Sequence, residues 1–99
     1  MQIVQERQER AITLKLHGRL ETRTAPELQE VVENELEDVM ELGLDLEDLE
    51  YVSSAGLRVL LAASKRMKAK GGAMTVYHVN DEVMEVFKIT GFDEILDIR

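Results

Sequence analysis

The sequence contains no cysteine and no tryptophan, one proline, two tyrosines and two phenylalanines. Without cysteine the chain has no disulfide, no thiolate nucleophile and no Cys-ligated metal. With so few aromatic side chains, the core has to consist mostly of Leu, Val, Ile and Met. No apolar run approaches the length needed to cross a bilayer, and the N-terminal stretch MQIVQERQER lacks the apolar centre of a signal peptide. These absences predict a cytoplasmic protein without membrane insertion.

Positive charge is scarce and unevenly placed. The formal net charge is −8, and no Lys or Arg occurs between Arg23 and Arg58, a stretch that is rich in acids. The segment Arg58–Lys70 has the opposite character, with several basic residues and no acid. Binding of DNA or RNA requires clusters of Lys and Arg, so the composition argues against a nucleic-acid partner. The uneven charge indicates either two solvated helix faces or a dipolar surface that orients a charged protein partner.

Ninety-nine residues, 44% of them apolar and 32% charged, fit a single domain over residues 1–99. Residues that alternate between apolar and polar predict strands, and apolar residues at helical spacing predict helices. The expected elements are a strand or arm at 2–8, strands at 12–17, 42–46, 73–79 and 94–98, and helices at 24–41, 54–70 and 81–90. The order β-β-α-β-α-β-α-β predicts an α/β fold with three helices on a mixed sheet of four or five strands.

Several residues mark the expected ends of the helices. Thr24 and Glu27 form a potential capping box for the first helix. Asn80 or Asp81 is expected to cap the third helix, and Gly91 to end it. The residues expected in the core are Leu44, Leu46, Leu57, Leu60, Leu61, Val76, Val83 and Phe87.

The stretch YVSSAGLRVLL places two serines where a predicted strand meets a predicted helix. In open α/β sheets, function collects at the carboxyl ends of strands. A serine nucleophile is not indicated, because Val52 stands where the G-x-S-x-G pattern has its first glycine. His17 and His78 read as strand residues rather than as catalytic bases. With no pair of histidines at ligand spacing and no phosphate-binding loop, we predict no enzyme, no metal and no cofactor.

Two other roles remain open for the serines. Ser54 could cap the following helix, with its Oγ accepting from the N–H of Gly56 or Leu57. Ala55 and Gly56 would leave the helix N-terminus open to another surface or to a phosphate. Ser54 could also be modified, because a phosphate there would meet free N–H groups. Acids at Glu47, Asp48 and Glu50 would oppose that phosphate, a balance that suits a switch.

Three segments resemble a known family. The segment LDLEDLEYVSSAGLRVLLAASKRMKAKGG is similar to the central motif of the STAS domain of bacterial anti-sigma factor antagonists. LHGRLETRTAPEL at 16–28 resembles the entry to the family's first helix, and EVFKITGFDEIL at 85–96 resembles its closing motif. The resemblance covers nearly the whole chain, and the segments occur in the expected order. It implies a STAS fold and a binding module rather than an enzyme.

By this resemblance, Ser54 is the phosphorylatable serine. Ser53 stands where many members carry Asp, Ala55 where many carry a second serine, and Glu21 where an Asp lies near the phosphorylation site. The resemblance implies that the unphosphorylated domain binds a serine-kinase anti-sigma factor, that phosphorylation releases it, and that a serine phosphatase restores binding. An alternative is an accessory subunit of a transport system or signalling assembly, with Ser54 as a structural helix cap.

A partner surface is therefore expected around the Ser53–Ser54 turn. It combines residues before the first helix, the acidic loop and the start of the second helix. Its members are Glu21, Thr22, Thr24, Glu47, Asp48, Glu50, Ser53, Ala55, Gly56 and Arg58.

Overall fold

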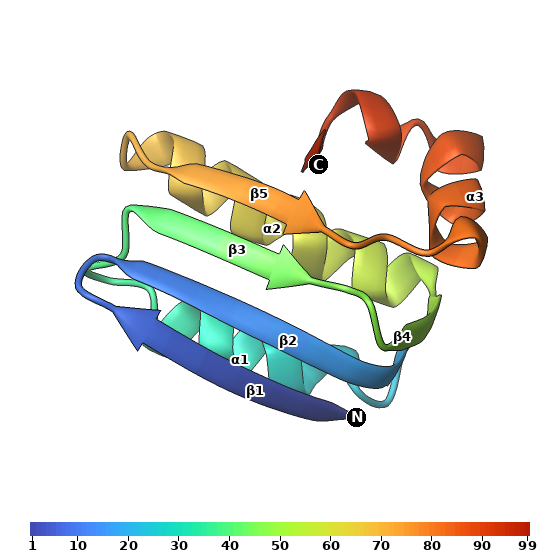
Figure 1. Cartoon of the computed structure of the whole chain (residues 1–99), viewed down its shortest axis with the longest axis horizontal. Helices are drawn as coiled ribbons and strands as arrows, with labels where there is room; N and C mark the ends of the chain where they lie inside the picture. Colours follow the sequence, from blue (N-terminus) through green and yellow to red (C-terminus); the bar gives the residue numbers. More distant parts are fainter.

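The computed structural model describes residues 1–99 as a sheet covered on one face by two helices, with a third helix at one end (Figure 1). The elements in chain order are β1 (Gln2–Gln8), β2 (Ala11–Leu20), α1 (Ala25–Asn34), β3 (Glu41–Asp45), β4 (Leu49–Val52), α2 (Ser54–Ala69), β5 (Ala73–Tyr77), α3 (Asp81–Thr90), the 3₁₀ helix η1 (Phe92–Glu94) and β6 (Asp97–Ile98). The predicted α/β fold with three helices on a mixed sheet is confirmed. The sheet has six strands rather than four or five, because the expected loop at 49–52 forms β4.

The strands follow the order β1-β2-β3-β5-β6, and β4 also pairs with β2. β1 is antiparallel to β2, and all other pairs are parallel. The long strand β2 has two partners on the same side. Its residues Ala11–Lys15 pair with β3, and Gly18–Leu20 pair with β4 after a register shift between Gly18 and Arg19. The turn that follows β4 is therefore anchored to the far end of β2.

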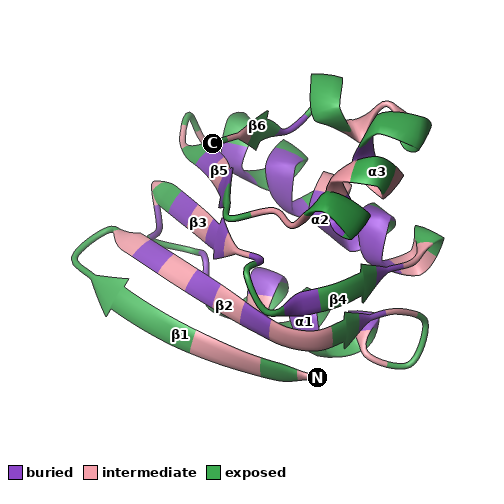
Figure 2. Ribbon diagram, turned by 45° about the vertical axis from the view of Figure 1, so that its right-hand side comes forward, coloured by how far each residue is buried: buried purple, intermediate pink, exposed green.

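Alternation along the central strands separates a buried face from an open one (Figure 2). In β2, Ile12, Leu14 and Leu16 are buried under α1 and α2, and the residues between them are only half-buried. The core consists of 24 residues, and Phe87 is its sole aromatic side chain, as the composition requires. Of the eight residues expected in the core, Leu61 alone is half-buried rather than buried. It lies about 100° around α2 from Leu60, at the border of the apolar stripe.

The first helix is shorter than expected. It ends at Asn34 rather than at 41, although Leu36 and Val39 after it are buried. Cationic side chains from other elements satisfy the carbonyls at this end. Arg66 Nη2 donates to Glu33 O at 3.3 Å, Arg7 Nη1 to Glu35 O at 3.2 Å, and Lys70 Nζ to Glu37 O at 2.8 Å and also to Leu36 O. These donors replace the helical bonds that a longer α1 would have made.

The capping box expected at Thr24 and Glu27 is absent, because Thr24 makes no side-chain cap. Its Oγ1 instead donates to Arg19 O at 2.6 Å and accepts from Glu21 N at 2.9 Å, so the hydroxyl holds the preceding loop. The predicted caps of the third helix are confirmed. Asn80 accepts from Val83 N at 2.9 Å, and Gly91 ends α3 with φ 80°.

Strand ends differ from the prediction in two places. β5 ends at Tyr77 instead of 79, because His78 has φ 57° and leaves the extended conformation. The last strand, expected at 94–98, is reduced to two residues, because η1 occupies the chain before it. None of the three α-helices has the length and hydropathy that a membrane span requires.

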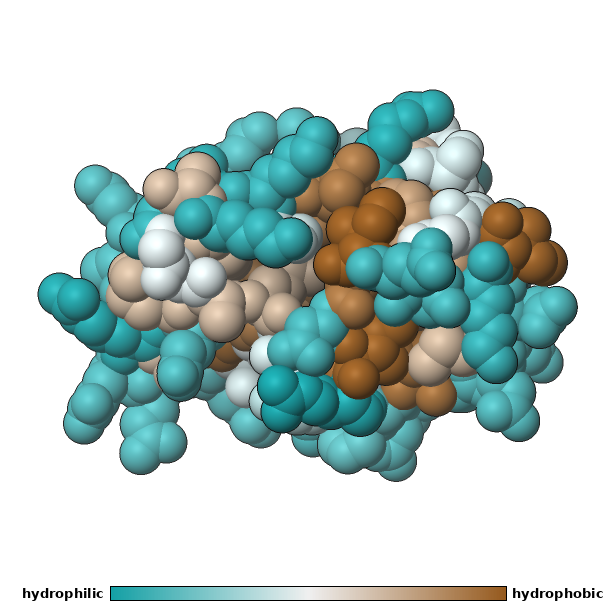
Figure 3. Space-filling model, turned by 90° about the horizontal axis from the view of Figure 1, so that it is seen from above, coloured by the Kyte–Doolittle hydropathy of each residue, from teal (hydrophilic) through white to brown (hydrophobic).

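The two edges of the sheet have different surfaces. β1 at one edge is polar and largely exposed. Near β6, at the other edge, Ile95 is 43% exposed and Ile98 is half-buried. Figure 3 shows apolar side chains gathered among charged ones on the face seen from above in Figure 1. Apolar surface therefore accumulates at the C-terminal edge, away from the acidic loop.

Candidate partner-binding site

The Ser53–Ser54 turn connects β4 to α2. Ser53, with extended backbone (φ −97°, ψ 176°), is the N-cap of α2, and its Oγ accepts from Gly56 N at 3.4 Å. The expectation that Ser54 would be the cap is therefore wrong, because Ser54 already belongs to the first helical turn. The backbone N–H of Ser53 donates to Leu20 O at 2.9 Å, which fixes the turn to the end of β2. Ser54 is exposed and has no capping role.

Gly56 is buried where α2 crosses the ends of β2 and β4. A Cβ on this residue would lie 2.7 Å from Leu20 Cγ, 2.9 Å from Leu20 O and 3.0 Å from Val52 Cγ2. The need for glycine thus comes from close packing within the chain. The open approach that we expected from Ala55 and Gly56 is left to Ala55, which is half-buried at the surface.

A groove of about 380 Å³ lies between the first turns of α1 and α2. It brings together three of the predicted contact residues, Thr22, Ala55 and Arg58. Its other lining residues are Ala25, Pro26, Gln29, Val59 and Ala62. These additional residues were not predicted as contacts, although the helices on which they lie were predicted. The groove is small-residue and apolar with one guanidinium, a surface that suits an apolar side chain accompanied by an acid.

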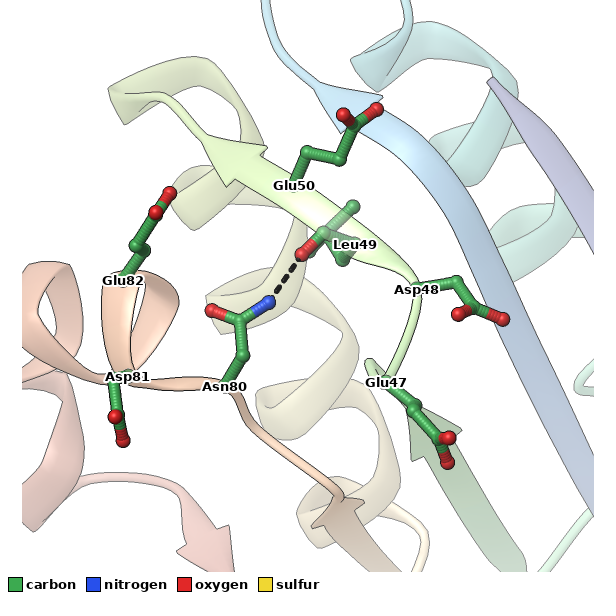
Figure 4. A pocket seen from close by; sticks show the side chains of 7 residues that line it. All are labelled: Glu47, Asp48, Leu49, Glu50, Asn80, Asp81 and Glu82. Carbon is green, nitrogen blue, oxygen red and sulfur yellow. Dashed lines mark hydrogen bonds between the residues drawn. The ribbon is translucent and has the colours of Figure 1, made fainter.

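A second hollow of about 650 Å³, here called the acidic basin, lies between the β3–β4 loop, β4 and the start of α3 (Figure 4). Three predicted residues, Glu47, Asp48 and Glu50, line it. Its other lining residues are Leu49, Asn80, Asp81 and Glu82. Asn80 Nδ2 donates to Leu49 O at 2.6 Å and ties α3 to β4.

The five carboxylates of the acidic basin point in different directions (Figure 4). Such an arrangement fits several separate cations on a protein surface better than one small ion. Asp81 and Glu82 were missed from the sequence, where they appear only as first-turn acids of a helix. Their place beside the acidic loop depends on β4, which was predicted as a loop.

Arg19 and Tyr51 form a further surface element that sequence reasoning missed. They are register partners on β2 and β4. The Arg19 guanidinium lies 4.5 Å from the centroid of the Tyr51 ring, and its Nε donates to Glu21 Oε2 at 3.1 Å. Tyr51 is 40% exposed. Tyr and Arg are among the residue types enriched at the energetic centres of interfaces. By contrast, the predicted contact residues Glu21 and Thr24 form hydrogen bonds within the chain.

Comparison with known proteins identifies the chain. The STAS domain profile matches residues 2–99. The anti-sigma-B factor antagonist of Bacillus subtilis is 30% identical over 90 residues, which cover 91% of this chain and 83% of that protein.

Solved structures show the same fold. An anti-sigma factor antagonist from Mycobacterium paratuberculosis superposes with a TM-score of 0.87 at 21% identity, covering 98% of this chain and 83% of that one. The Bacillus cell fate determinant SpoIIAA in its phosphorylated form has a TM-score of 0.78 at 15% identity, covering 99% of this chain and 91% of that one. The chain therefore belongs to the STAS domain family, among the anti-sigma factor antagonists, which are regulatory proteins and not enzymes.

Proposed function

We propose that this protein binds a serine-kinase anti-sigma factor while Ser54 is unphosphorylated and releases it when Ser54 is phosphorylated. Through this release it regulates transcription indirectly, and a serine phosphatase restores binding. The observation that carries the proposal is the division of roles in the turn. Ser53 caps α2, whereas Ser54 is exposed at the first helical position. The hydroxyl of Ser54 is thus accessible to a kinase without loss of the cap.

The site around Ser54 supports a phosphate that does not unfold the free domain. A phosphoserine carries about −1.5 to −2 charges near pH 7. The N-terminus of α2 favours this charge by roughly 0.3–1 kcal/mol. The acidic basin opposes it, by about 1 kcal/mol for each acid at contact distance in water and by less with salt. Both effects are small beside the ~5–15 kcal/mol that stabilises a domain of this size, and SpoIIAA, with a similar fold, has been solved in its phosphorylated form.

In a complex the balance changes. A phosphate buried at an interface loses its water, which costs several kcal/mol unless the partner supplies paired cations. A net loss of about 3–4 kcal/mol corresponds to two to three decades in the dissociation constant. Phosphorylation therefore releases the partner, while the domain stays folded and ready for the phosphatase.

Two surfaces flank Ser54 in this proposal. Thr22, Ala55 and Arg58 of the groove are assigned direct contacts, as are Glu47, Asp48 and Glu50 of the acidic basin. The acids should steer a cationic partner surface, so association should be faster at low salt. An association rate that does not change with ionic strength would remove the acidic basin from the interface.

Titration calorimetry against serine-kinase anti-sigma factors of the source organism tests the switch. Ser54→Ala should bind like the wild type and resist inactivation by ATP, and Ser54→Asp should bind at least about a hundredfold more weakly. Ser53→Ala is the matched control, because it removes the neighbouring hydroxyl and should keep the phosphorylation-dependent release. Equal affinities for Ser54→Ala and Ser54→Asp, or phosphate found by mass spectrometry on Ser53, would contradict the assignment.

The alternative of a transport or signalling-assembly subunit treated Ser54 as a helix cap. Because Ser53 has that role, the alternative no longer accounts for the Ser54 hydroxyl. The proposed switch operates in the cytoplasm, the compartment predicted from the composition.

A further inference from the structure

The two histidines of the chain, one on β2 and one directly after β5, face the same acidic turn. His78, directly after β5, has its Nδ1 3.1 Å from Asp45 Oδ1 and 3.8 Å from Glu47 Oε2. His17, on β2, has its Nδ1 3.4 Å from Asp48 Oδ2. Because β3 lies between β2 and β5, the segment 45–48 that follows it has an imidazole on each side. No sequence spacing indicates this convergence, since the three strands are far apart in the chain.

Three of these side chains form a compact set of ligand atoms. One nitrogen of His78 and one oxygen each of Asp45 and Glu47 all lie within 4.8 Å of one another. Ligands around one Zn²⁺ ion, at metal distances of about 2.0–2.2 Å, are separated by roughly 3–3.5 Å. The present set is wider than that, so binding requires the exposed His78 and Glu47 side chains to move closer together around the ion. We propose that Asp45, Glu47 and His78 bind a divalent transition-metal ion of the Zn²⁺ type.

Asp45 is the most firmly held of the three ligands. Its side chain is 12% exposed, and its Oδ1 accepts from the backbone N–H of Glu47 at 3.1 Å, which holds the carboxylate beside His78. Lys15 Nζ lies 4.0 Å from Asp45 Oδ2, so its positive charge partly offsets the negative charge of the three acids of this turn. This charge weakens the binding of a cation without preventing it.

The ligand set also determines which ions fit. Imidazole nitrogen favours Zn²⁺, Cu²⁺ and Ni²⁺ over Mg²⁺ and Ca²⁺, which prefer oxygen ligands. Three protein ligands leave at least one coordination position for water or for a group of a bound partner. Glu47 also lines the acidic basin, whereas Asp45 and His78 do not.

The competing explanation for the same geometry is an ion pair between a protonated His78 and the two carboxylates. Titration of the full chain with ZnCl₂ by calorimetry separates the two. The metal site requires saturable binding of one Zn²⁺ ion per chain, without competition from Mg²⁺. Absence of saturable binding up to millimolar Zn²⁺ would overturn the site and leave the ion pair.

Matched variants test the ligand set. His78→Asn removes the imidazole with a residue that tolerates the positive φ of this position, and it should weaken Zn²⁺ binding at least about tenfold. His17→Asn makes the same change on β2, outside the set, and should leave the affinity within about threefold. Equal losses in the two variants would overturn this ligand assignment. Zn²⁺-induced shifts confined to the His78 ring in the NMR spectrum of the wild type would support it without any variant.

The metal site shares only Glu47 with the proposed partner contacts, and it uses no residue of the Ser53–Ser54 turn. Ser54→Ala and Ser54→Asp should bind Zn²⁺ like the wild type. A failed Zn²⁺ titration would therefore leave the proposed function untouched, and a failed kinase titration would leave the metal site untouched.

Discussion

The two ends of α2 have different roles in the structure. At the N-terminal end, neutral small residues surround Ser54, and the exposed Arg58 is directed to the groove. At the C-terminal end, Arg66 and Lys70 donate to the carbonyls that end α1. The first end leaves a hydroxyl free at the surface, and the second commits its charges to the fold.

This difference adds a role that neither interpretation of the basic segment Arg58–Lys70 included. Arg66 and Lys70 make hydrogen bonds within the chain, whereas Arg58, Lys65 and Lys68 are exposed. Substitutions along α2 should therefore separate effects on stability from effects on binding.

The largest effect is expected in the middle of α2, where the helix packs into the core. Leu60 is fully buried, so Leu60→Ala should lower the free energy of unfolding by about 2–5 kcal/mol. Chemical denaturation followed by circular dichroism measures this loss. Leu61→Ala is the matched control, and it should cost clearly less because Leu61 is half-buried. Equal losses would mean that the helix faces the core with a different phase.

At the N-terminal end, Gly56→Ala should lower the free energy of unfolding by about 1–3 kcal/mol. The new methyl group would clash with Leu20 and Val52, and this clash outweighs a helix-propensity gain of up to about 1 kcal/mol. The melting temperature should fall by several degrees. A variant that melts at the wild-type temperature would show that the helix start can shift, and that the glycine is not required by packing.

At the C-terminal end, Lys70→Met should cost about 1–2 kcal/mol, because it removes the donor to Leu36 O and Glu37 O. Lys68→Met is the control, since Lys68 is an exposed neighbour on the same helix. Partner binding should be unchanged in both variants. Weaker binding of Lys70→Met, with stability unaffected, would reverse the roles assigned to the two ends.

The smallest effects distinguish the two serines. Ser53→Ala should cost about 0.5–1 kcal/mol, the low end for a helix cap, because its hydrogen bond to Gly56 N is long at 3.4 Å. Ser54→Ala should leave thermal stability unchanged. If the order of the two melting temperatures were the reverse, Ser54 would be the cap and the exposed hydroxyl would have a structural explanation.

The elements that the sequence predicted well are those with long periodic patterns. The correct strand was predicted from Leu44 and Leu46, and the correct helix from Leu57 and Leu60. The spacing of these residues places their side chains on one face of each element, and that face is buried. The stretch Leu49–Val52 was missed as a strand, since four residues between acids and serines show too little alternation, and its pairing with β2 depends on a distant bulge.

The end of α1 and the site residues depend on contacts between residues that are far apart in the sequence, which no local pattern predicts. Leu36 continues the helical spacing of α1, yet α1 ends at Asn34. Arg66 donates to a carbonyl of its last turn, and Arg7 and Lys70 donate to carbonyls of the segment that follows. The sequence correctly placed Ser54 at the start of α2, but the N-cap was assigned to Ser54 instead of Ser53. The convergence of His78 with Asp45 was not predictable, because it requires the parallel register of β3 and β5.

The divided pairing of β2 has a consequence for local unfolding. β3 pairs with both β2 and β5, whereas β4 pairs with the last residues of β2 alone. Segments held by few hydrogen bonds open at lower free energy than the centre of a sheet. Backbone amides of β4 should therefore exchange with deuterium through local opening, and those of β3 only through global unfolding. The turn that carries Ser54 would then open together with β4, without disturbing the central strands.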